Sequence, residues 1–460
     1  MKPFDCVIIG GGITGLAAAH RLKTLRPDAS FLLLESGSHL GGKIVTESVN
    51  GFTIEASADS FLSRKPEAVA LAEELGLLDR LQSPKPENRQ SWVLRCGKLH
   101  KIPEGLTGLI PANLEALTNN TLLSADAVAR IKAETEVPPA APKADESVAD
   151  FITRRMGREA FENLIEPLMG GIFGGRADLL SINATFPQLR NLEQKYGSLL
   201  LGLSENGNGA ALGVNGKLPP FLSFKGGMTE LIAALQTQIG EENIRCNALV
   251  ESVEALGGKY KISLKNARQA INAKSILLTT PAFTTAELLR SLDLELSDAL
   301  KAIPYSSSAI VTLAYDEKRL PRKPDGYGYI IPRIEERNVL ACTWTSAKWE
   351  NRAPEGKALF RVFLGRFGDK IDEIEDAALK KLALEELRET LSIDANPEIA
   401  KIQRWPHAMP QYTLGHLDRI QKIERLAKPH PGLALAGAYF HGVGVPDCIR
   451  EGRKAAESLV

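Results

Sequence analysis

The chain has no excess of charge of either sign and few cysteines, which excludes several classes of protein. Lys plus Arg and Asp plus Glu number 56 each, so the formal net charge is zero. Such a chain offers no overall electrostatic case for binding nucleic acid or an anionic membrane. Its five cysteines include no C-x-x-C pair. We therefore expect no disulfide framework and no metal centre, and we expect a reducing compartment.

The sequence also lacks a long hydrophobic run. No apolar segment approaches the roughly 18 residues that a membrane-spanning helix needs. Peripheral contact stays open, because Gly105 to Pro111 and Ser198 to Leu203 are apolar enough to touch a bilayer, although the same pattern is typical of buried segments. An apolar strand pattern already begins at Phe4, so we expect no signal peptide. The expected location is cytoplasmic, on the inner face of the membrane if the protein touches one.

The first strand, turn and helix predict a dinucleotide site. Phe4 to Ile9 has the pattern of a buried strand, and Leu16 to Leu25 that of a helix. Three glycines between them would give a tight turn, a close approach to a pyrophosphate and close helix–strand packing; they are Gly10, Gly12 and Gly15. A second strand, Phe31 to Leu34, ends in Glu35, at the distance of an acid that binds a ribose hydroxyl. A glycine-rich turn alone would be weak evidence, but these elements in this order favour a bound dinucleotide.

The run from Ser36 to Lys43 indicates which dinucleotide. It resembles the FAD-containing amine oxidase superfamily, in which the acid is followed shortly by Gly-Gly and a basic residue. The pair Gly41-Gly42 would let the backbone lie close to the cofactor, and Lys43 would face its phosphates. The family often has Arg at this point, so Lys43 gives up bidentate geometry. We expect FAD as the cofactor.

The resemblance implies an α/β fold with a discontinuous, Rossmann-like FAD-binding domain. A mixed-sheet substrate domain and a helical insertion would interrupt it, and the substrate cavity would lie between domains. A last helix is expected from Cys448 to Leu459. The predicted divisions are FAD-binding segments at 1–83, 216–291 and 401–460, a helical insertion with cavity or membrane contacts at 84–215, and a substrate-binding sheet domain at 292–400.

Three segments narrow the resemblance to the porphyrinogen oxidases. They run from Gly51 to Leu62, from Glu166 to Gly175 and from Arg404 to Tyr412. The middle segment is the most specific, because it lies outside the nucleotide-binding elements that the superfamily shares. With the closing run from Gly442 to Ile449, the likeness covers nearly the whole chain.

The glycine motif and the resemblance together give candidate site residues. Ser57 to Ser60 match a flavin-contacting stretch, although the family commonly has Gly-Pro where this chain has Ser57-Ala58. Val250 matches a strand residue whose backbone holds the adenine, and Trp405 an aromatic near the flavin; a plain sheet valine and a core tryptophan are the structural alternatives. The predicted FAD-binding residues are Gly10, Gly11, Gly12, Ile13, Thr14, Gly15, Glu35, Ser36, Gly42, Lys43, Ser57, Ala58, Asp59, Ser60, Val250, Trp405, Val443, Gly444 and Val445.

Two residues are candidates for contact with the substrate. Arg89 would bind a carboxylate at the rim of the pocket, and an exposed arginine without a ligand is the alternative. Gly171 would give a wall without side chains against a stacked macrocycle, where a plain turn or helix glycine would look the same.

The resemblance implies an FAD-dependent oxidase of haem biosynthesis. It would remove six electrons from a porphyrinogen, converting protoporphyrinogen IX to protoporphyrin IX or coproporphyrinogen III to coproporphyrin III, and reduce O2 to H2O2. The flavin would carry the chemistry, so no side chain is expected to be catalytic. The alternatives are another FAD amine oxidase or carotenoid desaturase, and a GDI-like binding protein without activity. A homodimer, and transfer of product to the next haem-pathway enzyme, are left open.

Overall fold

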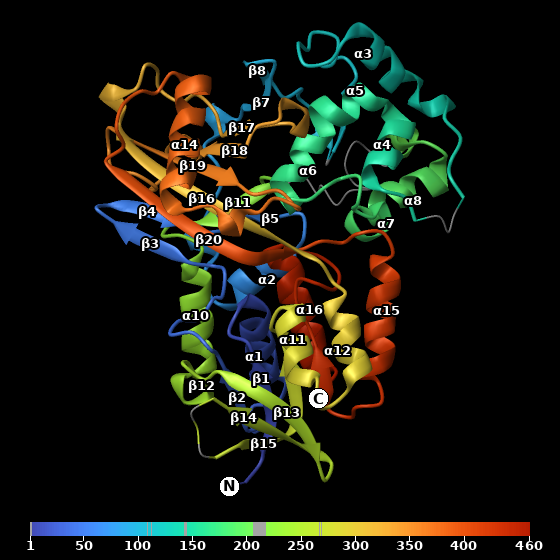
Figure 1. Ribbon diagram of the computed structural model, residues 1–460, viewed down its shortest axis with the longest axis vertical. Helices are drawn as coiled ribbons and strands as arrows, with labels where there is room; N and C mark the ends of the chain where they lie inside the picture. Colours follow the sequence, from blue (N-terminus) through green and yellow to red (C-terminus); the bar gives the residue numbers. More distant parts are fainter. Residues whose placement is uncertain are drawn as a thin grey trace.

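The computed structural model describes residues 2–107, 109–111, 113–141, 145–205, 218–265, 267 and 269–460. Figure 1 shows an α/β unit below, a second sheet at upper left and a group of helices at upper right. The predicted boundary between residues 215 and 216 lies outside the described residues. Among those described, no helix combines the length and apolar character needed to cross a membrane.

The lower unit is built on a mixed sheet whose centre is parallel. Strand β1 (Phe4–Ile9) pairs in parallel with β2 (Phe31–Leu34) on one side and β15 (Ile271–Leu278) on the other. Further strands extend it: β12 (Ile244–Arg245) beyond β2, then β21 (Leu433–Leu435), β14 (Lys259–Leu264) and β13 (Val250–Leu256) beyond β15. Three separate stretches of the chain thus contribute strands to this sheet, and each lies within one of the three predicted FAD-binding segments.

Alternation along β1 divides the apolar side chains between two cores. Cys6 and Ile8 face one core, and Val7 and Ile9 face the other. The first core packs against α1 (Ile13–Leu25), α2 (Glu67–Glu74), α10 (Thr229–Ile239) and α16 (Val445–Glu457). The second packs against α11 (Ala282–Leu289), α12 (Leu294–Lys301) and α15 (His416–Ala427). Helices therefore cover both faces of the sheet (Figure 1).

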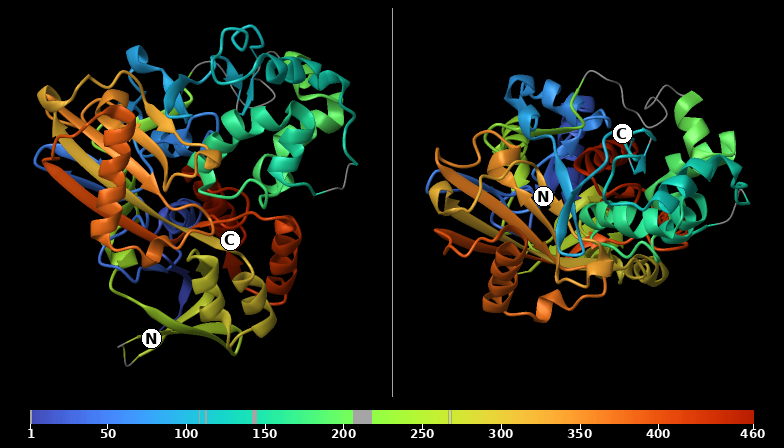
Figure 2. Two further views of the ribbon diagram at one scale, coloured as in Figure 1. Left: turned by 45° about the horizontal axis from the view of Figure 1, so that its top comes forward. Right: turned by 90° about the horizontal axis from the view of Figure 1, so that it is seen from above.

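A second sheet forms the upper left part of the molecule (Figures 1 and 2). Helix α14 (Asp376–Leu391) covers one of its faces through Leu379, Ala383 and Leu387. The strand order is β20 (Ile399–Pro410), β16 (Tyr305–Asp316), β19 (Lys357–Leu364), β18 (Val339–Trp344), β17 (Gly328–Ile330), β7 (Ser91–Arg95) and β8 (Lys98–Lys101). The sheet therefore extends beyond the predicted 292–400 segment at both ends: β7 and β8 precede it, and β20 continues to Pro410.

Short strands connect the two sheets. Strands β3 (Thr46–Val49) and β4 (Phe52–Glu55) form a hairpin. Next in the chain, β5 (Phe61–Leu62) pairs with β11 (Phe221–Phe224), which also pairs with β6 (Leu81–Gln82). The segment between β4 and β5, Ala56 to Ser60, is called the 56–60 loop below.

The helical insertion has a core of its own. Buried apolar side chains such as Phe151, Ile165 and Leu189 pack its helices together. The pair β9 (Leu106–Thr107) and β10 (Ile110–Pro111) precedes them. The helices are α3 (Ala125–Lys132), α4 (Val148–Met156), α5 (Arg158–Ala160), a π-helical turn (Phe161–Ile165), α6 (Glu166–Phe173), α7 (Ile182–Thr185), α8 (Pro187–Tyr196) and α9 (Leu199–Glu205).

The last helix begins earlier than the sequence pattern predicts. We expected it from Cys448, but α16 begins at Val445, with Gly444 as the N-cap and Pro446 within its first turn. Proline is tolerated there because the first N–H groups of a helix have no intrahelical partner. The shift places Val443 to Val445 directly at the N-terminus of a helix.

Glycine at position 452 sets how closely α16 packs against α1. A Cβ atom added to Gly452 would lie 2.1 Å from the carbonyl oxygen of Thr14. Replacement of Gly452 by Ala should therefore push the two helices apart and lower the free energy of unfolding by about 1–3 kcal/mol, as overpacking does. Urea denaturation of both proteins measures this.

Gly170→Ala is the matched control. A Cβ atom added to Gly170, within α6, would meet no atom within 4 Å. Its unfolding free energy should change by about 1 kcal/mol or less. Equal losses in the two variants would show that the contact between Gly452 and Thr14 does not limit the packing.

Candidate functional site

The first turn exposes the N-terminus of α1. Gly12 is the N-cap, and a Cβ atom added to it would meet nothing within 4 Å. A Cβ atom on Gly15 would instead lie 2.0 Å from the carbonyl oxygen of Gly10, whose φ is +114°. The motif therefore combines one close contact that only glycine permits with open space in front of unpaired N–H groups. Such a helix N-terminus favours an anion.

Glu35 lies beside this turn. Its carboxylate accepts hydrogen bonds from the N–H groups of Gly11 and Gly37, each at 2.7 Å. The Ser36 hydroxyl also donates to it, at 3.1 Å. The acid is thus held at the end of β2 beside the glycine turn, and its contact with a ribose stays a prediction.

Val250 stands close to the same strand end. The N–H of Ala248, two residues before it, donates to the carbonyl of Glu35 at 2.8 Å. The side chain of Val250 is buried in the second core of the lower unit. Only the backbone of Val250 is therefore left for contact with an adenine, and that role stays a prediction.

The second glycine pair packs on the first turn. The N–H of Gly41 donates to the carbonyl of Gly11 at 2.8 Å, and a Cβ atom on Gly42 would lie 3.2 Å from the Cα of Gly12. Lys43 follows, near Cys448 in the first turn of α16. Burial lowers the pKa of Lys43, and among the described residues this ammonium group forms no ion pair. A half-buried cation between two helix N-termini is suited to a phosphate.

The start of α16 is held by charges. The N–H of Gly444 donates to Asp447 at 3.3 Å, and Asp447 also binds Lys65 at 2.5 Å and Arg450 at 3.0 Å. Asp447 therefore stabilises the N-terminus of α16 from a position within the first turn of that helix. Val443 packs against the core of the helical insertion, so this segment joins that insertion to the lower unit.

The 56–60 loop is held by side chains from the second sheet. Trp405, on β20, donates from Nε1 to the carbonyl of Ala56 at 2.7 Å. Arg361, on β19, donates to the carbonyl of Ser57. Trp349 donates from Nε1 to Asp59 at 3.1 Å. The structure thus brings Trp405 to the predicted flavin-contacting stretch, on a strand that we had placed in the FAD-binding part of the chain.

Asp59 is ionised in this setting. Burial favours its neutral form, but Lys348 and Arg361 outweigh that effect and hold the pKa of Asp59 well below its usual range. The Lys348 Nζ atom lies 3.2 Å from an Asp59 oxygen. Sequence reasoning missed Lys348, Trp349 and Arg361, because they lie about 290–300 residues beyond the loop and belong to no motif.

The two candidate substrate contacts lie at opposite ends of β17. Arg89 is exposed, two residues before the β7 residue Ser91 that pairs with Gly328. Gly171, in α6, is also exposed, and a Cβ atom added to it would lie 3.9 Å from Cγ2 of Ile330. Their contact with a substrate stays a prediction.

These features are those of a nucleotide-binding flavoprotein, and comparison with known proteins agrees. The family model described as flavin containing amine oxidoreductase matches residues 13–460. The chain belongs to this family. It is therefore an FAD-dependent oxidoreductase, and the predicted cofactor and enzyme class are confirmed.

Two curated relatives of this flavoprotein align over nearly all of its length. Coproporphyrinogen III oxidase of Bacillus subtilis is 36% identical over 99% of this chain and 97% of its own. Protoporphyrinogen oxidase 1 of Arabidopsis thaliana chloroplasts is 28% identical over 97% of this chain and 86% of its own. The predicted resemblance to the porphyrinogen oxidases is confirmed.

A solved structure gives the same result for the fold. A protein of Exiguobacterium, whose assignment as a protoporphyrinogen oxidase is itself provisional, superposes with a TM-score of 0.87 at 33% identity. The superposition covers 100% of this chain and 99% of the other. The predicted α/β fold is confirmed.

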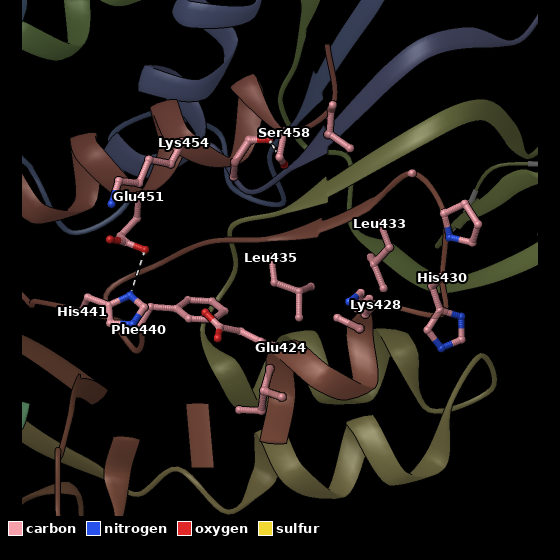
Figure 3. Close-up of a pocket in the computed structure, with 16 residues that line it drawn as sticks. Glu424, Lys428, His430, Leu433, Leu435, Phe440, His441, Glu451, Lys454 and Ser458 are labelled. Carbon is pink, nitrogen blue, oxygen red and sulfur yellow. Dashed lines mark hydrogen bonds and ion pairs between the residues drawn. The ribbon is translucent and has the colours of Figure 1, made fainter. Parts of the chain in front are cut away.

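A large cavity in the described part of the chain lies away from these residues. It has a volume of about 550 Å³ and opens between α15, α16 and the edge strand β21 (Figure 3). Its lining combines apolar side chains such as Leu433, Leu435 and Phe440 with charged ones such as Lys454. None of the predicted FAD or substrate residues lines it, and we assign it no part in the flavin site.

Replacement of Lys43 by Met should separate the effect of this lysine on stability from its effect on FAD binding. Removing a desolvated charge should raise the melting temperature of the FAD-free protein, while FAD binding should weaken by about tenfold or more, the loss expected for one charged hydrogen bond. Lys43→Arg, which keeps the charge, should retain FAD. Fluorescence titration of the FAD-free proteins measures affinity; unchanged affinity in the Met variant would show that Lys43 faces no phosphate.

His416 gives the fold a dependence on pH. Its ring is buried, stacks on Tyr412 at 4.0 Å between centroids, and has its pKa lowered by burial to about 4. The unfolded state binds the proton more tightly than the folded state. The contribution of neutral His416 to the free energy of unfolding should therefore be fully present above about pH 6.5, and the free energy of unfolding should fall by up to about 3 kcal/mol as the pH drops toward 4. Urea denaturation across this range should show the fall, and His416→Phe should reduce it. Parallel curves for the two proteins would contradict the assignment.

Proposed function

We propose that this flavoprotein oxidises coproporphyrinogen III to coproporphyrin III in haem biosynthesis, with O2 as the electron acceptor. The observation that carries the proposal is the full-length similarity to the Bacillus subtilis coproporphyrinogen III oxidase, at 36% identity. The similarity to the Arabidopsis protoporphyrinogen oxidase is lower, at 28%. This difference favours coproporphyrinogen III, which has four carboxylates, over protoporphyrinogen IX, which has two.

The arrangement of residues suits this reaction. FAD supplies the acceptor for hydride removed from a carbon atom of the macrocycle. The N-terminus of α1 and Lys43 would hold the pyrophosphate, Glu35 the ribose, and the backbone of Val250 the adenine. The 56–60 loop, Trp405 and the segment Val443 to Val445 would hold the flavin ring. Arg89 would bind a carboxylate of the macrocycle, and the bare surface at Gly171 would admit its flat body.

The test is porphyrin fluorescence after FAD-loaded protein is mixed in air with each porphyrinogen separately. We expect coproporphyrinogen III to be oxidised at least tenfold faster, as kcat/KM, than protoporphyrinogen IX. Faster oxidation of protoporphyrinogen IX would overturn the choice of substrate. No fluorescence from either, with flavin bound, would overturn porphyrinogen oxidation and direct the search to amines and carotenoids.

Arg89→Ala should raise KM for coproporphyrinogen III by about three- to tenfold, the range for one charge-assisted contact at an exposed rim. The FAD content and kcat should stay at the wild-type level, because Arg89 is remote from the nucleotide-binding turn. Arg158→Ala is the control: Arg158 is 80% exposed in the helical insertion and paired with Glu162. Equal KM values in all three proteins would identify Arg89 as a surface charge.

The cytoplasmic location, the peripheral membrane contact, the homodimer and the transfer of product stay predictions. Of the leucines in the segment Ser198 to Leu203, Leu199 and Leu203 are buried and Leu201 is 46% exposed. Leu199 and Leu203 therefore belong to the core of the helical insertion, and of these three leucines Leu201 is the one that a bilayer could contact.

A further inference from the structure

The 56–60 loop lies over a group of buried charges. Asp59 binds Lys348 and lies 3.8 Å from the guanidinium of Arg361. Behind it, Arg352 lies 3.6 Å from Glu55, the last residue of β4. The group therefore has three cationic and two acidic side chains, and we call these five residues the charge cluster.

Glu55 and Arg352 serve mainly to join strands. Burial raises the pKa of Glu55, which accepts hydrogen bonds from the Thr46 hydroxyl at 2.7 Å and the Met228 N–H at 2.9 Å. Arg352 donates to the Ser223 hydroxyl at 3.0 Å and to the Phe224 carbonyl at 2.9 Å. The hydrogen bonds of Arg352 are thus directed at β11 and not at the loop.

Arg361 differs from Arg352 in what it contacts. Its side chain is 1% exposed, and it donates to the Ser57 carbonyl. Its Nε atom, like that of Arg352, is buried and donates no hydrogen bond within the described part of the chain. Asp59, which it faces, is shared with Lys348. Glu55 also acts on Arg361, but the three cations of the charge cluster outnumber its two acids. Positive charge therefore remains beneath the loop, in a region of low dielectric constant where charges act strongly.

We propose that Arg361 is a positioning residue that both holds the 56–60 loop and makes the bound flavin a stronger electron acceptor. A positive charge favours the electron-rich, reduced form of a neighbouring group over its oxidised form. The negative charge of Asp59 has the opposite effect. The reduction potential of the bound flavin therefore depends on both side chains. The inference rests on the proposed function only in placing the loop at the flavin ring.

The test compares the flavin midpoint potentials of the Arg361→Gln and Asp59→Asn variants. Loss of the cation should lower the potential, and loss of the anion should raise it. We expect each to change the two-electron equilibrium by about tenfold, which corresponds to about 30 mV. Opposite shifts are the specific signature, because damage to the loop alone would move both potentials in the same direction.

Two further variants separate charge from position. Arg361→Lys keeps the charge but not the planar fork, so its potential should lie near the wild-type value while its FAD content falls. Arg366→Gln is the control for losing a buried arginine: Arg366 is 6% exposed and donates to the carbonyls of Ile331 and Arg337, away from the loop. It should lower the melting temperature and leave the potential unchanged.

Unshifted potentials in Arg361→Gln and Asp59→Asn, or shifts of the same sign, would overturn the inference. So would a shift in Arg366→Gln as large as that in Arg361→Gln. The measurement needs only bound FAD. It therefore gives a result even if neither porphyrinogen is oxidised, and the failure of the proposed function is distinguishable from the failure of this inference.

Discussion

Buried charged side chains hold the second sheet against the nucleotide-binding unit. Arg361 and Trp405 reach the carbonyls of two successive loop residues, and Asp59 returns the contact to Lys348 and Trp349. Removing one partner from such a group leaves a buried charge unpaired, which costs several kcal/mol. The loop at the junction is therefore held largely by charged side chains, and these contacts join the two sheets.

The first turns of α1 and α16, which carry the predicted phosphate and flavin contacts, depend on close packing. Gly15 and Gly452 each occupy a place where a Cβ atom would lie within about 2 Å of a carbonyl oxygen. This brings the first turn of α1 against both β1 and α16, so two helix N-termini open on the same region as Lys43. Unpaired N–H groups and a half-buried cation then make a site for an anion before any ligand is bound.

Much of the lower unit could be predicted from local pattern. Phe4–Ile9 and Phe31–Leu34 have the bounds that the sequence indicated, because apolar periodicity and the following glycines or acid define them locally. The membership of β7, β8 and β20 in the second sheet could not be predicted in this way. The sheet takes in β7 and β20 by pairing with β17 and β16, strands far away in the sequence, and such pairing leaves no local signal. For the same reason, the sequence offered Asp59 as a site residue but not Arg361, its partner from a strand 300 residues away.

In the proposed reaction, electrons pass from a porphyrinogen to FAD held at the junction of the two sheets. The most direct measurement is the absorbance of the bound flavin after FAD-loaded protein is mixed with coproporphyrinogen III in the absence of oxygen. We expect the yellow colour to bleach as porphyrin absorbance rises, and air to restore it. A flavin that stays oxidised in the presence of excess coproporphyrinogen III would show that electrons do not pass from this porphyrinogen to the flavin.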